Sequence, residues 1–585
     1  MLPLPSVDDR APLWRLLLCL GFGIVLAEWL PRGSPGAALG ILFLLSQLLS
    51  HRRRNWGDPD KPFGDKGWEG ALIRPSCCIL AFAVYAQWRS PPPIDAEGFR
   101  DGWYTLDLRL QRTYERTNAR AQQIYGQGIL LDGPALASSF RNQRVYFMLD
   151  KKSPQRHYRG QTLRVRAHLQ LLKGRTTAHS FESYLQRVRI PLHIDRGNIR
   201  SVVREGPAFF RHCRRLQERA RAQLLCPQGD TPLLRGMLLN CRGDLPRSQK
   251  QLFTRTGVAH LLAISGLHVD IIGWALEVFL KCLRFSRRRR RLPCILLLGL
   301  YTWIIGAPPS AIRAFLMRTY LGSAGFFSRR ASTLSAISFA GLLSLLAHPQ
   351  QLWDWGMQFS YGAVLCIALL GSPLANHLSR RLRPQTPNFK PLSWRHWLRP
   401  LLSYGLNSFC ISAPIALLTL PLSIEYFGSF SLGGILINLI AIPLALGLII
   451  GGFCTLIIAC LFGGPGHWIL TQLLLPYIRG FEGILRFCDE HLACFWTCST
   501  AIPGLGLTTL LGVMALSLVG HRHYRKHFCR TRAYQIAMEQ KALASCRHGR
   551  RGDVQHPHRR PARPPRPEEP PAPSITHPQA SPAGP

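Results

Sequence analysis

The chain of 585 residues is 47% hydrophobic and carries a formal charge of +41. Its mean hydropathy is only +0.04, because strongly apolar segments alternate with strongly basic ones. Soluble globular chains rarely contain repeated apolar runs of about 20 residues, the length of a membrane-spanning helix. The composition therefore excludes an ordinary soluble protein and indicates a polytopic α-helical membrane protein.

The charge limits the possible partners less sharply. Lys and Arg collect in the cytoplasmic loops of membrane proteins, and this rule explains most of the excess. A basic surface also suits a polyanion such as nucleic acid or anionic lipid. Charge alone does not choose between these partners.

Residues 1–97 predict N-terminal transmembrane segments. Apolar runs at 12–30, 37–50 and 71–88 are interpreted as spans, the first of them an uncleaved anchor. The third is followed by three prolines, which act as a stiff spacer.

The pattern changes at 98–205, where segments such as RVYFMLD and QTLRVRAHLQLL alternate apolar with polar residues. A period of two is typical of half-buried strands, and glycines at 126, 128, 133 and 160 are predicted turns. We expect a small extracytoplasmic β-barrel, and a five-stranded OB-like barrel fits the spacing, although any small barrel gives this pattern. Residues 206–245 form a connector whose basic amphipathic helix (209–225) lies on a membrane surface or in solvent.

Residues 246–522 predict the main transmembrane domain, followed at 523–585 by a disordered tail rich in Pro and Arg. Late spans are expected to begin near 401, 429, 444 and 503, with a broken helix at Pro443. We expect about nine to eleven crossings in total. Placing the large basic clusters in the cytoplasm leaves the β domain outside and the tail inside.

The stretch 253–272, FTRTGVAHLLAISGLHVDII, is apolar yet contains several polar side chains. A helix turns about 100° per residue, so one continuous helix would present Gly257, His260, Ile264 and His268 on one face. Polar side chains at membrane depth line a wet path or join neighbouring helices. Both interpretations stay open on helix physics alone.

The segment HLLAISGLHV (260–269) resembles the signature helix of the ComEC-type competence family, channels that pass DNA across the bacterial inner membrane. GAPPSAIRAFLM (306–317), HPQQLWDWGMQFSYGAVL (348–365) and ILINLIAIP (435–443) resemble later segments of that family, in the same order. The layout is also similar, with N-terminal spans, an OB-like insert and then a competence domain. The resemblance implies a multi-pass inner-membrane channel that takes up single-stranded DNA during natural transformation.

A DNA strand brings one negative charge per nucleotide into the bilayer, so its path needs water and positive or hydrogen-bonding groups. Arg313 and Arg318 are the candidates for phosphate contact, and arginines that reach to the interface are the alternative. We expect Asp270 to face away from phosphate and Glu277 to pair with Lys281. The predicted DNA-path residues are His260, Ser265, His268, Ser310, Arg313, Arg318, Gln358 and Asn438. The predicted structural residues of the motifs are Gly257, Gly266, Gly306, Pro309, Asp354, Gly356 and Pro443.

The chain also departs from the family pattern. Asp270 stands where the family usually has glycine, and we expect a variant without the C-terminal metallo-β-lactamase-like domain of many members. The segment most similar to that domain's metal motif contains His521, His523 and His527. Because these histidines lie in a basic run, neither a metal nor another cofactor is expected. No Gly-x-x-x-x-Gly-Lys-Ser/Thr loop is present. We therefore expect no enzyme activity and a separate DNA receptor and cytoplasmic ATPase, with a separate nuclease left open.

Two rival functions come from other classes. A small-solute or ion transporter would use the same polar segment, and an internal inverted repeat would favour it, but no clear repeat is found. A membrane scaffold would bind partners through its β domain and basic tail.

Overall fold

In the computed structural model the described residues are 17, 20, 21, 24, 82, 83, 85, 86, 99–117, 122–133, 140–150, 157–172, 181–225, 231–286, 289–324, 333–381, 394–492 and 494–498. All of them belong to the compact unit Met1–Leu518. The predicted span at 37–50, the span near 503, the tail 523–585 and the histidines at 521–527 lie outside the described residues.

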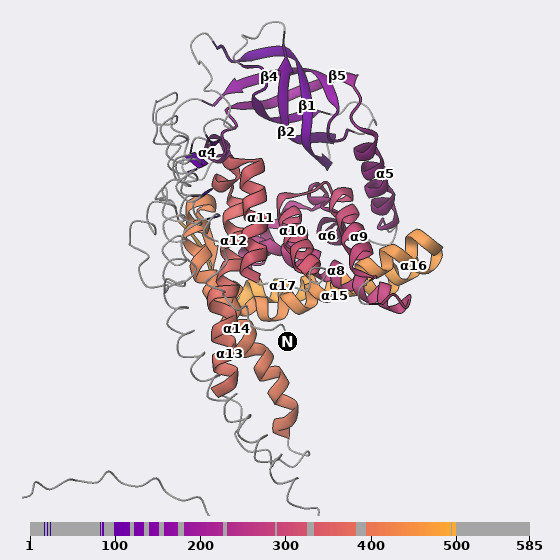
Figure 1. Cartoon of the computed structure of the whole chain (residues 1–585), viewed down its shortest axis with the longest axis vertical. Helices are drawn as coiled ribbons and strands as arrows, with labels where there is room; N and C mark the ends of the chain where they lie inside the picture. Colours follow the sequence, from indigo (N-terminus) through magenta and orange to yellow (C-terminus); the bar gives the residue numbers. More distant parts are fainter. Residues whose placement is uncertain are drawn as a thin grey trace, which may run out of the picture. The chain divides into compact units, whose positions relative to one another are not determined.

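Five strands close into a barrel (Figure 1). The order around it is β1-β2-β3-β5-β4, and β3 and β5 run parallel while the other neighbours are antiparallel. The predicted small β-barrel is therefore confirmed. The strands are β1 (Gly102–Thr117), β2 (Gln122–Asp132), β3 (Arg144–Asp150), β4 (Thr162–Leu171) and β5 (Leu192–Arg204).

The alternating sequence pattern fills the barrel. In β3, Val145, Phe147 and Leu149 are fully buried while the residues between them are half-exposed. Successive side chains of a strand point to opposite faces, so each strand contributes every second residue to one apolar core.

Two of the four predicted turn glycines are instead inside a strand. A Cβ on Gly126 would lie 2.0 Å from the carbonyl oxygen of Arg112, and one on Gly128 would lie 2.7 Å from Leu108. The pairing of β1 with β2 shifts register beside Arg112, and such a bulge brings the two backbones close together. Gly160, with a φ of +86°, does form a turn.

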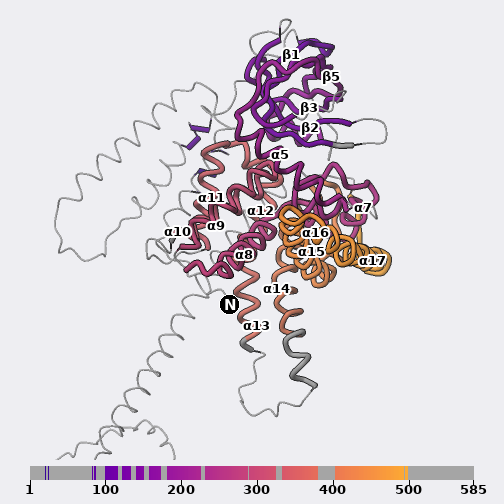
Figure 2. The backbone as a smooth tube through the Cα atoms, turned by 90° about the vertical axis from the view of Figure 1, so that its right-hand side faces the viewer, coloured from indigo at the N-terminus to yellow at the C-terminus, as the bar shows by residue number. Residues whose placement is uncertain are grey.

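Two helices accompany the barrel, α4 (Phe181–Arg187) and α5 (Ala208–Gln223). The second confirms the predicted amphipathic helix, and its buried side, with Gln217 and Glu218, faces protein. Arg214 of α5 binds Glu115 of β1 at 2.9 Å. Helix α5 thereby connects the barrel with the helical region (Figures 1 and 2).

The helical region follows the barrel in sequence. Its helices are α6 (Pro232–Leu239), α7 (Arg247–Arg255), α8 (Gly266–Cys282), α9 (Arg291–Ile304), α10 (Pro309–Ala324), α11 (Thr333–Ala347), α12 (Trp355–Cys366), α13 (Ser372–Arg381), α14 (Trp394–Phe427), α15 (Gly434–Phe462), α16 (Gly464–Ile469) and α17 (Leu475–His491). Short helical segments are η2 (Arg242–Asp244), η3 (Ala259–Leu262), η4 (Pro349–Trp353), η5 (Ile367–Gly371) and η6 (Leu470–Leu474), and the strands β6 (Ser429–Ser431) and β7 (Phe495–Thr497) pair with each other.

Within the described part of the chain, three helical segments are long and apolar enough to cross a membrane: Trp355–Ser379, Leu402–Phe427 and Gly434–Phe462. Helices α9 and α11 are apolar but shorter. These segments support a membrane protein, and the number of crossings stays a prediction. Helices α13 and α14 run side by side in both views (Figures 1 and 2).

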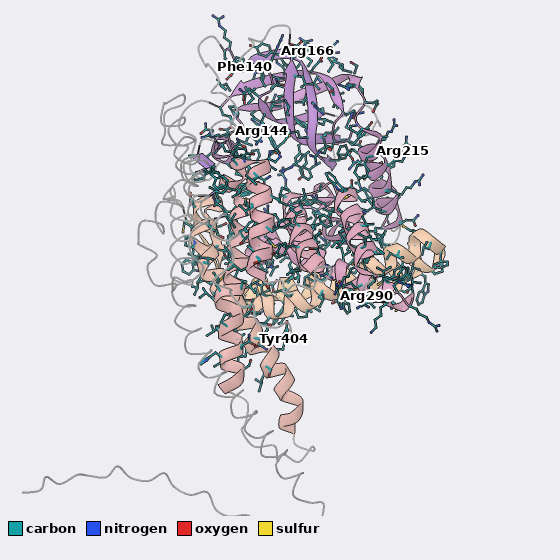
Figure 3. All side chains as sticks on the ribbon, viewed as in Figure 1. Phe140, Arg144, Arg166, Arg215, Arg290 and Tyr404 are labelled. Atoms are coloured by element: carbon teal, nitrogen blue, oxygen red, sulfur yellow. The ribbon has the colours of Figure 1, made fainter. Side chains whose placement is uncertain are left out.

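The predicted spans near 429 and 444 are one helix, α15, and the predicted break at Pro443 is wrong. Proline has no N–H to donate to the carbonyl four residues earlier. That carbonyl belongs to Leu439, and the hydroxyl of Tyr404 on α14 donates to it at 3.1 Å. A neighbouring helix thus supplies the missing donor, and α15 continues; Tyr404 is labelled in Figure 3.

The stretch 253–272 is not one helix, so the common face predicted for Gly257, His260, Ile264 and His268 is wrong. Helix α7 ends at Arg255, Gly257 takes a φ of +74°, and α8 begins only at Gly266. The short segment η3 lies between them. The polar residues are therefore placed by a loop as well as by a helix.

Candidate functional site

Helix α10 is the element around which the motif segments assemble. It packs against α8, α9, α11 and α12. The hydroxyl of Ser310, in its first turn, donates to the carbonyl of Ile264 at 2.6 Å. A Cβ on Gly266 would lie 3.7 Å from Ala314, and such small residues let helices approach closely. The start of α8 is thus fixed against α10.

Arg313 points from α10 into the protein and is 2% exposed. Its Nη2 donates to the carbonyl oxygen of Gly356 at 2.8 Å, and its guanidinium carbon lies 5.7 Å from the ring centre of Tyr361. Its Nε is buried and unbonded, and no described carboxylate lies within ion-pair distance. A buried cation without a counter-ion is costly, so this side chain is suited to an incoming anion.

His268 is fully buried at the start of α8. Its Nδ1 accepts from the backbone N–H of Ser265 at 3.3 Å and lies 2.9 Å from the hydroxyl oxygen of Ser265. The side chain of Ser265 in turn accepts from the backbone N–H of His268, and the two reciprocal contacts form a capping box. Because Nδ1 accepts, the proton of a neutral ring is on Nε2, which has no partner among the described atoms. His260 lies nearby and is exposed.

Arg318 differs from Arg313, because two carboxylates neutralise it. Its Nη2 lies 3.0 Å from Glu277 and its Nη1 lies 3.4 Å from Asp270. The expected pairing of Glu277 with Lys281 is therefore wrong. Arg318, which we expected to contact phosphate, instead joins α10 to α8.

At the start of α12, Asp354 caps the helix by accepting from the N–H of Gly356 at 2.7 Å. Gln358 donates to the carbonyl of Leu352 at 3.0 Å and accepts from the hydroxyl of Tyr426 at 2.8 Å. Both ends of its amide are used, so Gln358 joins α12 to α14. These bonds hold the carbonyl of Gly356 in place for Arg313.

Gly257 packs against the first residue of α15. A Cβ on Gly257 would lie 2.9 Å from the Cα of Gly434. One turn further along α15, Asn438 is half-buried, and its Oδ1 has no partner among the described atoms. Bonds thus join Ser265 to His268, Ser310 to the loop before α8, and Arg313 to α12, whereas Asn438 bonds to none of these residues in the described part of the chain.

Comparisons with known proteins identify the family of the segments described above. The family model described as "Competence protein" matches residues 237–523. This region belongs to the competence protein family. It holds every predicted path residue, whereas the barrel and α5 precede it.

Three curated proteins are similar to parts of this chain. "ComE operon protein 3" of Bacillus subtilis (strain 168) is 29% identical over 198 residues, 34% of this chain and 25% of that protein. "Uncharacterized protein YcaI" of Escherichia coli (strain K12) is 27% identical over 227 residues, 36% of this chain and 26% of that protein. "Recombination protein 2" of Haemophilus influenzae is 25% identical over 326 residues, 54% of this chain and 38% of that protein.

The chain thus covers between 25% and 38% of the length of these three relatives. No solved structure matches the chain significantly.

Sequence reasoning missed a cavity where the barrel meets the competence region. Its walls come from β1, α5, the loop with η2 and the turn between α9 and α10. Among its residues, only Gly306 was a predicted site residue. The other segments are far apart in sequence, and no local pattern indicated that they meet.

Proposed function

We propose that this protein is a multi-pass membrane channel that imports single-stranded DNA during natural transformation, in the inner membrane of a bacterium. The match to the competence family supports uptake of DNA as the process. The observation that carries the channel role is Arg313, a buried arginine without a paired carboxylate in the described part of the chain. A passing phosphate would supply the missing negative charge.

The path runs past the joined ends of α8, α10 and α12. Arg313 would attract each phosphate, and the Nε2–H of His268 and the amide of Asn438 would offer hydrogen bonds. Neutral donors bind a phosphate less tightly than a second arginine, so the strand is not trapped.

The barrel belongs to the proposal as an OB-type module on the extracytoplasmic side. Its five strands and its closure support this type. Such barrels hold single strands through a basic groove and stacking aromatic side chains. The positive-inside rule supports the outside placement and a cytoplasmic tail.

The protein is proposed to carry no enzyme activity. Energy would come from a separate cytoplasmic ATPase, and capture of DNA from a separate receptor. A separate nuclease is compatible with the proposal, because the chain only has to pass the strand.

The experiment is uptake of labelled DNA in cells with and without this gene. Deletion is expected to abolish transport of DNA into a nuclease-resistant state while binding at the cell surface continues. Complementation with the wild-type gene restores transport, whereas complementation with Arg313→Met does not. Normal uptake in the deletion strain would contradict the proposal.

A further inference from the structure

A cavity of about 80 Å³ lies between the barrel and the competence region. A cavity of this size can hold several water molecules or one small polar group. Five arginines and three carboxylates line it: Arg112, Arg159, Arg214, Arg221, Arg242, Glu115, Glu218 and Asp244.

The three carboxylates of the cavity are already bound. Arg214 contacts Glu115 at 2.9 Å and Glu218 at 3.0 Å. Asp244 accepts from Arg221 at 2.7 Å and from the buried Arg235 at 3.1 Å. The negative charge of the cavity wall is thus used to hold α5 against β1 and η2.

Three arginines remain without an acidic partner in the described part of the chain: Arg112, Arg159 and Arg242. Burial and the neighbouring charge of Arg112 lower the pKa of Arg159, as expected for two cations that line one cavity. The Nε–H of Arg242 is a buried donor without a partner. An unbonded donor in a basic cavity suits an anion.

Two aromatic rings hold Arg159 in place. Its guanidinium carbon lies 5.4 Å from the ring centres of both Phe210 and Trp303. Cation–π contacts of this kind orient a guanidinium without neutralising it. Trp303 comes from α9, so the competence region positions an arginine of the barrel.

The cavity is electrostatically connected to the proposed path. The charge of Arg112 acts on Arg313 as well as on Arg159, and the charge of Arg242 acts on His268. Gly306, which precedes α10 with a φ of +87°, also lines the cavity, and a Cβ there would meet open space. The charges of Arg112 and Arg242 therefore act on Arg313 and His268 of the proposed path.

We propose that this cavity binds one phosphodiester group of the incoming single strand through Arg112, Arg159 and Arg242, where the strand leaves the barrel and reaches the competence region. The inference rests on the proposed function and assigns it a second binding site. A planar guanidinium can donate two parallel hydrogen bonds to a phosphate. Three such groups around a space of this size would select a phosphodiester over a larger anion.

The test measures binding of a fluorescent oligothymidylate to the full chain in nanodiscs of phosphatidylcholine, at several salt concentrations. The triple variant R112Q/R159Q/R242Q removes the three unpaired arginines. Its matched control, R166Q/R200Q/R215Q, removes three exposed arginines from the barrel and α5. Arg166 and Arg215 lie on the outer surface in Figure 3.

Loss of one phosphate contact reduces the slope of log affinity against log salt by about 0.7 and lowers affinity at 0.1 M salt about five-fold. We expect this change or a larger one in the cavity variant, and less than half of it in the control. Trp303→Leu should reproduce part of the loss, because Arg159 loses one of its two rings.

Equal losses in both triple variants would show a diffuse basic surface and overturn the cavity site. Wild-type binding by the cavity variant would overturn it as well, while leaving the channel intact. A wild-type chain that binds no oligothymidylate would contradict the proposed function itself. Adding phosphatidylglycerol distinguishes a lipid occupant. If phosphatidylglycerol binds the chain only when the three arginines are present, while the cavity variant binds the oligonucleotide as tightly as wild type, the cavity holds a lipid headgroup and the proposal is contradicted.

Discussion

Arg313 on α10 donates a hydrogen bond from Nη2 to the carbonyl oxygen of Gly356, 2.8 Å away in the first turn of α12. The bond joins two of the motif segments on which the family resemblance rests. It uses one nitrogen of a guanidinium whose Nε stays unbonded in the interior. The arginine is therefore held in position while keeping its capacity to bind an anion.

The first prediction concerns the shape of this side chain. Arg313→Lys keeps the charge but loses the planar fork, and a hydrogen bond to a charged group contributes about 1.5–3 kcal/mol. We expect DNA import to fall about ten-fold or more. Arg313→Met should abolish import at a normal protein level, because an apolar side chain replaces a buried charge without a folding penalty. Import by the Met variant at the wild-type rate would contradict this role.

Arg318 is predicted to behave differently, because Glu277 and Asp270 already neutralise it. Arg318→Met should lower thermal stability in detergent by less than about 1 kcal/mol, the usual range for a partly exposed ion pair. Import, normalised to protein level, should stay within two-fold of wild type. A loss as large as that of Arg313→Met would show that Arg318 acts on the strand after all.

Gly257 combines a φ of +74° with close contact to Gly434. Gly257→Ala is expected to destabilise the protein by about 1–3 kcal/mol, since a left-handed backbone and a backbone contact both oppose a Cβ. Gly480→Ala is the matched control, because a Cβ on Gly480 would meet nothing within 4 Å. Thermal unfolding in detergent compares the two, and equal melting temperatures would refute the argument.

A double-mutant cycle tests the account of α15. Tyr404→Phe removes the donor to the carbonyl of Leu439 and should cost about 1 kcal/mol. In a Pro443→Ala background, the new N–H of residue 443 donates to the carbonyl of Leu439. Tyr404→Phe should then leave the free energy of unfolding almost unchanged. Equal costs in both backgrounds would show that the hydroxyl of Tyr404 does not compensate for the proline.

The barrel should respond to acid through His193. Burial lowers the pKa of His193 from 6.5, and this outweighs the opposite effects of Asp195 and Glu182. The unfolded chain therefore binds the proton first, so stability is full above pH 6.5 and falls below it until the folded ring also protonates.

This loss of stability is measured by hydrogen exchange of the β3 and β5 amides in the full chain. Exchange is compared at neutral pH and at a pH about one unit below the ordinary pKa of histidine. His193→Gln should reduce it, and His212→Gln, an exposed position on α5, should not. Unchanged acid sensitivity in His193→Gln would contradict the assignment.

Local patterns were sufficient to predict the barrel and α5, because alternation and helical amphipathicity are properties of neighbouring residues. The break at Gly257 was missed, because its conformation depends on contact with Gly434 on a distant helix. Pro443 misled for a similar reason: the donor that compensates for it, Tyr404, lies on another helix.

The sequence was sufficient to name the residues of the candidate site, but it predicted only some of their contacts. The motifs named Ser265 and His268, which lie in contact, and Ser310, which bonds to the residue before Ser265. They also named Arg313, which bonds to the first turn of α12. They gave no means of separating Arg313 from Arg318, since the carboxylates that neutralise the latter come from α8. The three arginines of the cavity without an acidic partner could be identified only from the three-dimensional structure, because their neighbours come from distant parts of the sequence.

The most direct test of the channel is import of end-labelled single-stranded DNA into cells that carry the wild-type gene, the Arg313→Met variant or the Arg318→Met variant, at matched protein levels. The account predicts nuclease-protected label with wild type and Arg318→Met, and none with Arg313→Met, although surface binding is equal in all three. Protected label in the Arg313→Met cells at the wild-type rate would contradict it.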